Sequence, residues 1–131
     1  MKQIHVSGKR KRAIARATLM PGNGNVRINK LNLDYYEPKL ARTKIREPLL
    51  LTKEVSDKVD IDINVMGGGV MSQAEAVRLA IGRALVKHNA NLKERLLDYD
   101  RHLLVADVRR KEVSKPNSRG QARSKRQKSY R

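Results

Sequence analysis

The sequence predicts a small α+β sandwich in which helices pack on one face of a β-sheet. From Val59 to Met66, apolar and polar residues alternate, which is typical of a strand with one buried and one wet face. Beyond the glycines that follow, apolar residues recur at helical spacing from Ala74 to His88. Strand signals precede helix signals along the 131 residues, a length that suits one domain.

The first strand signal runs over residues 4–20. In its second half, small apolar residues occupy the odd positions and mostly basic residues the even positions, so we predict one strand with a basic outer face. Residues 21–25 then form a turn, because Asn-Gly tolerates the positive φ values of a tight hairpin. Residues 26–28 would return as the second arm of this hairpin.

Between residues 31 and 51 the pattern is weaker. We expect a short helix around Tyr35 and Tyr36, and a second helix from Leu40 to Arg46 that Pro48 ends.

The second half of the chain reads as helical. Ser72 and Glu75 have the spacing of a capping box, which opens a helix after the glycines. Basic residues on its other faces, among them Arg78 and Arg83, give this helix a basic exterior. A further helix is predicted over residues 92–99, with its leucines packed inward.

Positive charge is concentrated at the two ends of the chain. There are 30 Lys and Arg against 13 Asp and Glu, a formal net charge of +17. Residues 1–18 contribute +6 and residues 109–131 contribute +9, which leaves only +2 for the 90 residues between them. We therefore predict a folded domain over residues 1–108 and an extended basic tail over residues 109–131. The tail has too few apolar residues to offset its ordering entropy and should stay disordered until it meets a partner.

The composition excludes several classes of function. Without cysteine there is no disulfide scaffold, thiol nucleophile or Cys-rich zinc site. No apolar run approaches the roughly 18 residues that span a bilayer, and no signal peptide is evident, so we expect a soluble, intracellular protein. The histidines His5, His88 and His102 are isolated. We expect no enzyme and no cofactor.

So large a positive charge requires a polyanionic partner, with nucleic acid first and an anionic membrane surface second. The shortage of aromatic residues argues against a base-stacking platform, and no helix-turn-helix or zinc finger is evident. A basic tail that folds into structured RNA fits better. Composition leaves RNA against DNA open, and a DNA-compacting architectural protein is one alternative.

Two short motifs allow both a functional and a structural interpretation. Gly67–Gly69 lies before a helix N-terminus, where backbone N–H groups could meet a phosphate or where glycine merely lets the chain bend. Asp60 and Asp62 share one strand face at a spacing of roughly 7 Å. They could hold Mg²⁺ in a nuclease, which is a second alternative, although a solvated strand face is the commoner outcome.

Several strings of residues resemble one known family. In chain order they are Gly8–Ala17, Gly22-Asn23-Gly24, Arg46–Leu49, Val65–Gly69, Asp107-Val108-Arg109 and the terminal Gln127–Arg131. Their order and spacing resemble protein nine of the small ribosomal subunit over essentially the whole chain. The ending Gln-Lys-Ser-Tyr-Arg is similar to that of archaeal and eukaryotic members, and the short length favours an archaeal source.

The resemblance implies a two-layer fold with a mixed sheet and a left-handed βαβ crossover, as in the second domain of ribosomal protein five. It implies a structural protein of the cytoplasmic ribosome that binds the 3′ major domain of rRNA in the subunit head, beside other head proteins and not as a homo-oligomer. The end of the tail would approach peptidyl-site tRNA. The expected rRNA contacts are Lys9, Arg10, Lys11, Arg12, Arg16, Gly67, Gly68, Gly69, Arg78, Arg83, Arg109, Arg110, Lys111, Arg119, Arg123, Lys125 and Arg126, and the expected tRNA contacts are Lys128, Tyr130 and Arg131.

Overall fold

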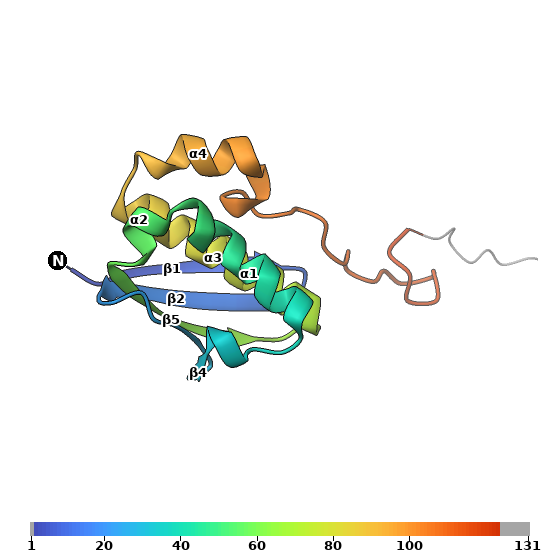
Figure 1. The fold of residues 1–131 in the computed structure, drawn as a ribbon. Coiled ribbons are helices and arrows are strands. Elements are labelled where there is room, and N and C mark those ends of the chain that lie inside the picture. The colour runs from blue at the N-terminus through green and yellow to red at the C-terminus, as the bar shows by residue number, and fades with distance from the viewer. Residues whose placement is uncertain (1, 124–131) are drawn as a thin grey trace, which may run out of the picture.

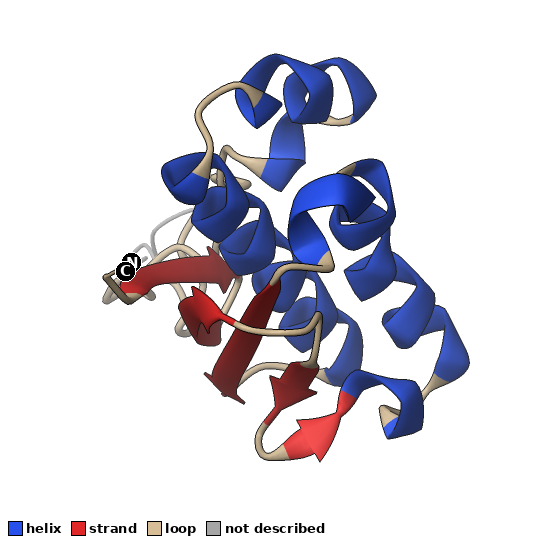
Figure 2. Cartoon of the chain, turned by 60° about the vertical axis from the view of Figure 1, so that its left-hand side comes forward, coloured by secondary structure: helices blue, strands red, loops and turns tan. Residues whose placement is uncertain are grey.

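The computed structural model describes residues 2–123 as a β-sheet with helices layered on it (Figure 1). Five strands form one sheet in the order β1-β2-β5-β3-β4. Strands β3 and β5 run parallel and the other neighbours antiparallel, so the sheet is mixed. Figure 2 shows the helices gathered on one side of the strands. The predicted α+β class is therefore confirmed.

Along the chain, strands β1 to β4 come first, and the long strand β5 lies between two groups of helices. They are β1 (Ile4–Arg10), β2 (Ala13–Pro21), β3 (Val26–Ile28), β4 (Leu31–Asn32), the 3₁₀ helix η1 (Leu33–Tyr35), α1 (Lys39–Leu51), α2 (Lys53–Ser56), β5 (Val59–Met66), α3 (Val70–His88), α4 (Leu92–Tyr99) and the 3₁₀ helix η2 (Arg101–Leu103).

The segment predicted as one strand, residues 4–20, forms two antiparallel strands. Strands β1 and β2 are joined at Lys11 and Arg12, and Arg10 pairs with Ala13 across the turn. Lys11 has a φ of 54°, the left-handed conformation that tight hairpin turns favour. Because the turn has two residues, the inward-facing positions change from even in β1 to odd in β2. The prediction followed one apolar-polar alternation through residues 4–20 as a single strand and therefore missed this change.

The hairpin predicted between β2 and β3 is wrong. Strand β5 lies between them and pairs with both. The turn that follows β2 instead wraps around Asp60, whose Oδ1 accepts hydrogen bonds from the backbone N–H groups of Asn23 and Asn25, each at 3.0 Å. Sheet order is set by long-range pairing, which a short turn signal does not encode.

Helix α1 continues to Leu51 through Pro48, which was expected to end it. A proline inside a helix removes one hydrogen bond and costs about 3 kcal/mol. Pro48 is buried together with Ala41 and Ile45, and α1 packs against α3. The Thr52 hydroxyl also donates a hydrogen bond to the Pro48 carbonyl at 2.8 Å. Tertiary packing thus prevails over the local helix-stopping signal.

The strand over residues 59–66 and the helix over residues 92–99 are confirmed with the predicted bounds. The capping box of Ser72 and Glu75 is wrong, because α3 begins at Val70 with Gly69 as its N-cap residue. Glu75 lies inside the helix, and its carboxylate accepts hydrogen bonds from side chains of β1 and α1 instead.

Strand β1 approaches α3 so closely that Gly8 has no room for a side chain. A Cβ atom at Gly8 would lie 2.5 Å from the Ala76 carbonyl oxygen and 2.8 Å from the Ala80 nitrogen. The backbones of strand and helix therefore touch at this point. The contact holds the end of β1, and the turn that follows it, against the N-terminal half of α3.

Gly8→Ala should lower the free energy of unfolding by about 1–3 kcal/mol, because its methyl group has to displace the backbone of α3. Urea denaturation followed by circular dichroism measures this loss. Gly69→Ser is the matched control, since no atom lies within 4 Å of a Cβ at Gly69 and serine suits a helix N-cap. Equal stability of the two variants would contradict the close approach.

Candidate nucleic-acid interface

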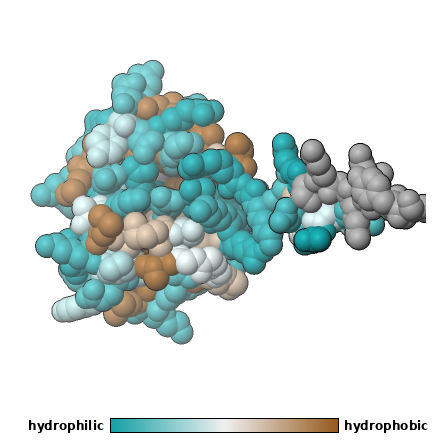
Figure 3. Space-filling view, turned by 90° about the vertical axis from the view of Figure 1, so that its right-hand side faces the viewer, coloured by the Kyte–Doolittle hydropathy of each residue, from teal (hydrophilic) through white to brown (hydrophobic). Residues whose placement is uncertain are grey.

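A cleft at the end of the sheet brings together three segments that are far apart in the sequence. These are the β1–β2 turn, the glycines before α3 and the start of the basic tail. We call this the basic cleft; its charged and glycine lining consists of Lys9, Lys11, Arg12, Gly68, Gly69, Arg109, Arg110, Lys111 and Glu112. Six of these side chains are cations, and Glu112 is the one carboxylate among the described lining residues. Figure 3 shows hydrophilic side chains gathered around the point where the tail leaves the domain, with apolar side chains on other parts of the same face.

The glycines position the N-terminus of α3 beside the β1–β2 turn. Gly67 and Gly68 have φ values of 80° and 66°, which favour glycine. A Cβ at Gly67 would lie 2.6 Å from the Arg12 carbonyl oxygen, and one at Gly68 would lie 3.0 Å from the Ala13 nitrogen. These two glycines therefore have a structural role in bringing two turns together. Gly69 is the N-cap residue of α3, and no side chain caps the helix there. A Cβ at Gly69 would face open space.

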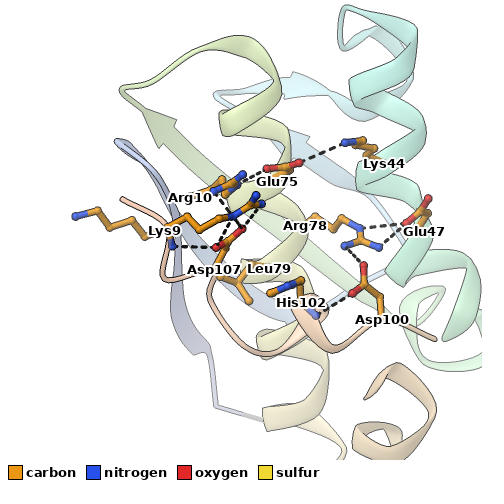
Figure 4. A pocket seen from close by; sticks show the side chains of 11 residues that line it. Lys9, Arg10, Lys44, Glu47, Glu75, Arg78, Leu79, Asp100, His102 and Asp107 are labelled. Carbon is orange, nitrogen blue, oxygen red and sulfur yellow. Dashed lines mark hydrogen bonds and ion pairs between the residues drawn. The ribbon is translucent and has the colours of Figure 1, made fainter. Parts of the chain in front are cut away.

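Five of the six cations in the basic cleft have no partner among residues 2–123. Within residues 2–123, no ion pair or side-chain hydrogen bond involves Lys9, Lys11, Arg12, Arg110 or Lys111. Figure 4 shows the Lys9 side chain pointing away from the neighbouring carboxylates. The sixth cation, Arg109, is paired, with its Nη2 2.6 Å from Asp107 Oδ2. Unpaired cations that converge on one cleft are suited to neutralising phosphates with release of counterions.

Arg10 was expected to contact rRNA, but its side chain turns inward and is only 14% exposed. Its Nε lies 2.6 Å from Glu75 Oε2, and its Nη1 lies 3.3 Å from Asp107 Oδ2 (Figure 4). Lys44 from α1 reaches the other Glu75 oxygen at 3.3 Å. Burial alone raises the pKa of Glu75, but the hydrogen bonds from Arg10 and Lys44 outweigh it and hold the pKa below its usual value.

Arg78 and Arg83 are also bonded within the domain. Arg78 lies between Glu47 of α1, at 2.5 Å, and Asp100 in the segment after α4, at 3.0 Å. Arg83 donates to two backbone carbonyls, that of Leu104 at 3.1 Å and that of Ser7 at 3.0 Å. These arginines join α3 to its neighbours. Their predicted rRNA contacts stay a prediction, and their observed role is structural.

The remaining predicted contacts lie outside the basic cleft. Arg16 is exposed on β2, opposite Asn64 in the sheet. Arg119 is exposed in the tail, and Arg123 Nε lies 2.5 Å from Glu112 Oε2. The other predicted tail contacts, Lys125, Arg126, Lys128, Tyr130 and Arg131, lie outside the described residues.

Sequence reasoning missed the carboxylates that hold the buried arginines. Glu47, Glu75, Asp100 and Asp107 come from separate segments, and no local spacing relates them to their partners. The only local signal was the Asp107-Val108-Arg109 string. Arg109 donates from its backbone N–H to Asp107 Oδ1 at 2.9 Å, so this string forms a small turn at the start of the tail.

The proposed magnesium site has no support in the geometry. Asp60 accepts the backbone hydrogen bonds of the turn after β2, and Asp62 forms an ion pair with Arg27 at 3.0 Å. Residues 2–123 contain no group of three or more potential metal ligands. In the same range, no helix has the length and apolar character needed to cross a membrane.

An α+β domain that gathers cations unpaired within residues 2–123 in one cleft has the features of the class of small basic proteins that bind polyanions. A family model described as ribosomal protein S9/S16 matches residues 8–131. The chain is 49% identical over 134 residues to small ribosomal subunit protein uS9 of Methanococcus maripaludis, with full coverage of both chains. It is 51% identical over 133 residues to the protein of that name from Methanothrix thermoacetophila, again with full coverage. The chain belongs to the ribosomal protein S9/S16 family, which confirms the resemblance stated above.

Arg78→Met should lower the free energy of unfolding at pH 7 by about 1–3 kcal/mol, because Glu47 and Asp100 lose their shared cation. Hydrogen bonds from His102 and Arg78 lower the pKa of Asp100 although burial raises it. This contribution is therefore present above the ordinary carboxylate pKa of about 4 and is lost as the pH falls through the lowered value. The difference between the variant and the natural chain should shrink as the pH falls below the ordinary carboxylate pKa, and urea titrations at several pH values would measure this.

Arg95→Met is the control for this experiment. Arg95 forms an ion pair with Glu54, and both side chains are about half exposed, so the pair should contribute less than about 1 kcal/mol to the free energy of unfolding. A loss at Arg78 that equals the loss at Arg95, or one that does not vary with pH, would contradict the structural role.

Proposed function

We propose that the chain is a structural protein of the small ribosomal subunit that binds rRNA through the basic cleft. Family membership places it among proteins of the cytoplasmic ribosome, which are not enzymes. The observation that carries the proposal for the cleft is the convergence of Lys9, Lys11, Arg12, Arg110 and Lys111, all without ion-pair partners in residues 2–123.

The pairing of the cations supports two different roles within one basic chain. A cation that already binds a carboxylate gains less from a phosphate, since the existing bond has to be given up. The free cations of the cleft carry no such penalty and retain their counterions until RNA replaces them. We therefore expect the cleft to contribute most of the RNA affinity of the domain, and Arg10, Arg78 and Arg83 to contribute mainly to its stability.

Finer points of the proposal rest on the family resemblance. We infer that the domain docks on the 3′ major domain of the rRNA, in the head of the subunit and beside other head proteins, and that the tail runs from the cleft toward peptidyl-site tRNA. Its end would act through Arg131, whose guanidinium can bridge two phosphate oxygens, with Lys128 and Tyr130 nearby. The left-handed crossover between β3 and β5 stays a prediction.

Lys11→Gly should weaken binding to folded small-subunit rRNA and reduce the slope of log K against log salt by about one, because one phosphate contact is lost. Filter binding at several salt concentrations measures both. Glycine relieves the positive φ of Lys11, so loss of folding does not confuse the result.

Lys30→Gly is the matched control, since Lys30 is an exposed lysine with a φ of 69° at the opposite edge of the sheet, between β3 and β4. Both variants lose one positive charge. Equal losses of affinity would contradict a specific role of the cleft. Tighter binding of the natural chain to duplex DNA than to folded rRNA would favour the DNA-compacting alternative.

Arg131→Ala should reduce retention of tRNA in the peptidyl site of reconstituted small subunits, with little change in rRNA affinity, because only the tail end is altered. Retention of labelled tRNA on a filter measures the effect. Arg119→Ala removes the same charge earlier in the tail and should retain tRNA as the natural chain does. Unchanged retention after Arg131→Ala would remove the proposed role of the tail end.

A further inference from the structure

The segment that leads into the tail, residues 104–108, is tied to the rest of the folded domain. Leu104 is held through its carbonyl by Arg83, and Asp107 is held through its carboxylate by Arg10. The side chain of Asp107 is only 13% exposed, whereas that of Arg109 is 77% exposed. The change from a held to an exposed chain therefore occurs at Asp107.

Arg10 is itself fixed on the side away from the tail. Its Nε bonds one carboxylate oxygen of Glu75 in α3. Lys44 of α1 bonds the other oxygen, so Glu75 is held between cations from two elements. The backbone of β1 lies directly against α3 at Gly8, two residues earlier, which fixes where Arg10 leaves the strand. Arg10 Nη1 is buried and makes no hydrogen bond, so its attraction is directed to Asp107 at 3.3 Å.

Asp107 also shapes the tail that follows it. Its Oδ2 lies 2.6 Å from Arg109 Nη2 and 2.9 Å from Arg109 Nε, and its Oδ1 accepts the Arg109 backbone N–H. Hydrogen bonds from Arg109, together with the charges of Arg10 and Arg109, hold the pKa of Asp107 far below its usual value. The carboxylate is therefore ionised throughout the physiological range.

One carboxylate thus connects the domain to the cations of the basic cleft. Arg109 lines both the cleft and the neighbouring pocket that contains Arg10, Glu75 and Asp107. Six cations in one cleft repel one another, and an unanchored tail would carry its three cations away from the domain. The carboxylate of Asp107 lies next to Arg109 and offsets part of this repulsion. It thereby keeps the start of the tail along the cleft.

We propose that Asp107 is a positioning residue that ties the tail to β1, so that Arg109, Arg110 and Lys111 line the basic cleft before RNA arrives. These three residues would then be an exception to the disorder expected of the tail from its composition. The consequence for RNA rests on the function proposed above, whereas the anchoring does not. Preorganisation of this kind reduces the ordering entropy that binding would otherwise have to overcome. The proposal predicts that loss of the Asp107 charge weakens RNA binding. Simple electrostatic attraction predicts the opposite, because the protein surface becomes more positive.

The anchoring is tested without RNA by electron paramagnetic resonance on the full chain. The chain has no cysteine, so spin labels at Ser72→Cys and Ser114→Cys, on two walls of the cleft, report one distance distribution. Asp107→Asn should broaden this distribution. Asp107→Glu, which retains the charge, should leave it narrow, and so should Asp98→Asn, which removes an exposed acid of α4 that has no ion pair within residues 2–123. An unchanged distribution in Asp107→Asn would overturn the anchoring.

The same chains, without labels, are then compared in rRNA binding. Asp107→Asn should bind about three- to tenfold more weakly despite its higher positive charge, and Asp107→Glu should recover most of the loss. Affinity that is unchanged or increased in Asp107→Asn would overturn the positioning role. If the natural chain failed to bind rRNA, the proposed function would fall, while the distance distributions would still decide the anchoring.

Discussion

The contact of β1 with α3 at Gly8 is the constraint on which the interface depends. Because the two backbones meet there, the next inward-facing side chain, Arg10, enters a space already bounded by α3 and finds Glu75. The outward-facing Lys9 and the turn beyond are then held beside the glycines that open α3. A side chain at Gly8 would separate the strand from the helix and would disturb both the buried ion pairs and the basic cleft.

The net charge of the chain is less informative than the pairing of its cations. Arg10, Arg78 and Arg83 are basic residues in a basic protein, yet each is bonded to oxygen atoms of its own domain. Desolvated arginines of this kind stabilise a fold by joining elements, and the planar guanidinium suits two partners at once. The free cations gather where three segments meet, so the tertiary structure divides one composition into a stabilising set and a set available for phosphate.

Local patterns predicted some elements well and others badly. The strand over residues 59–66 and the helix over residues 92–99 have bounds set by nearby signals, and both were predicted correctly. The turn at Lys11 was missed because a two-residue turn leaves the apolar-polar alternation intact and only moves the apolar residues from even to odd positions. The end of α1 was placed too early because burial of Pro48 outweighs its local effect. Glu75 was assigned to a cap although cations from two other elements surround it.

The sequence by itself determined the α+β class, the concentration of charge at the two ends and the likeness to a ribosomal family, since each depends on composition or on residues close together along the chain. Only the tertiary structure decided which cations of residues 2–123 are paired with a carboxylate and which are not. Arg10 and Glu75 are 65 positions apart, and their bond exists because β1 lies on α3. An ion pair requires its two groups to be close in space, and the fold brings residues together that are far apart in the sequence.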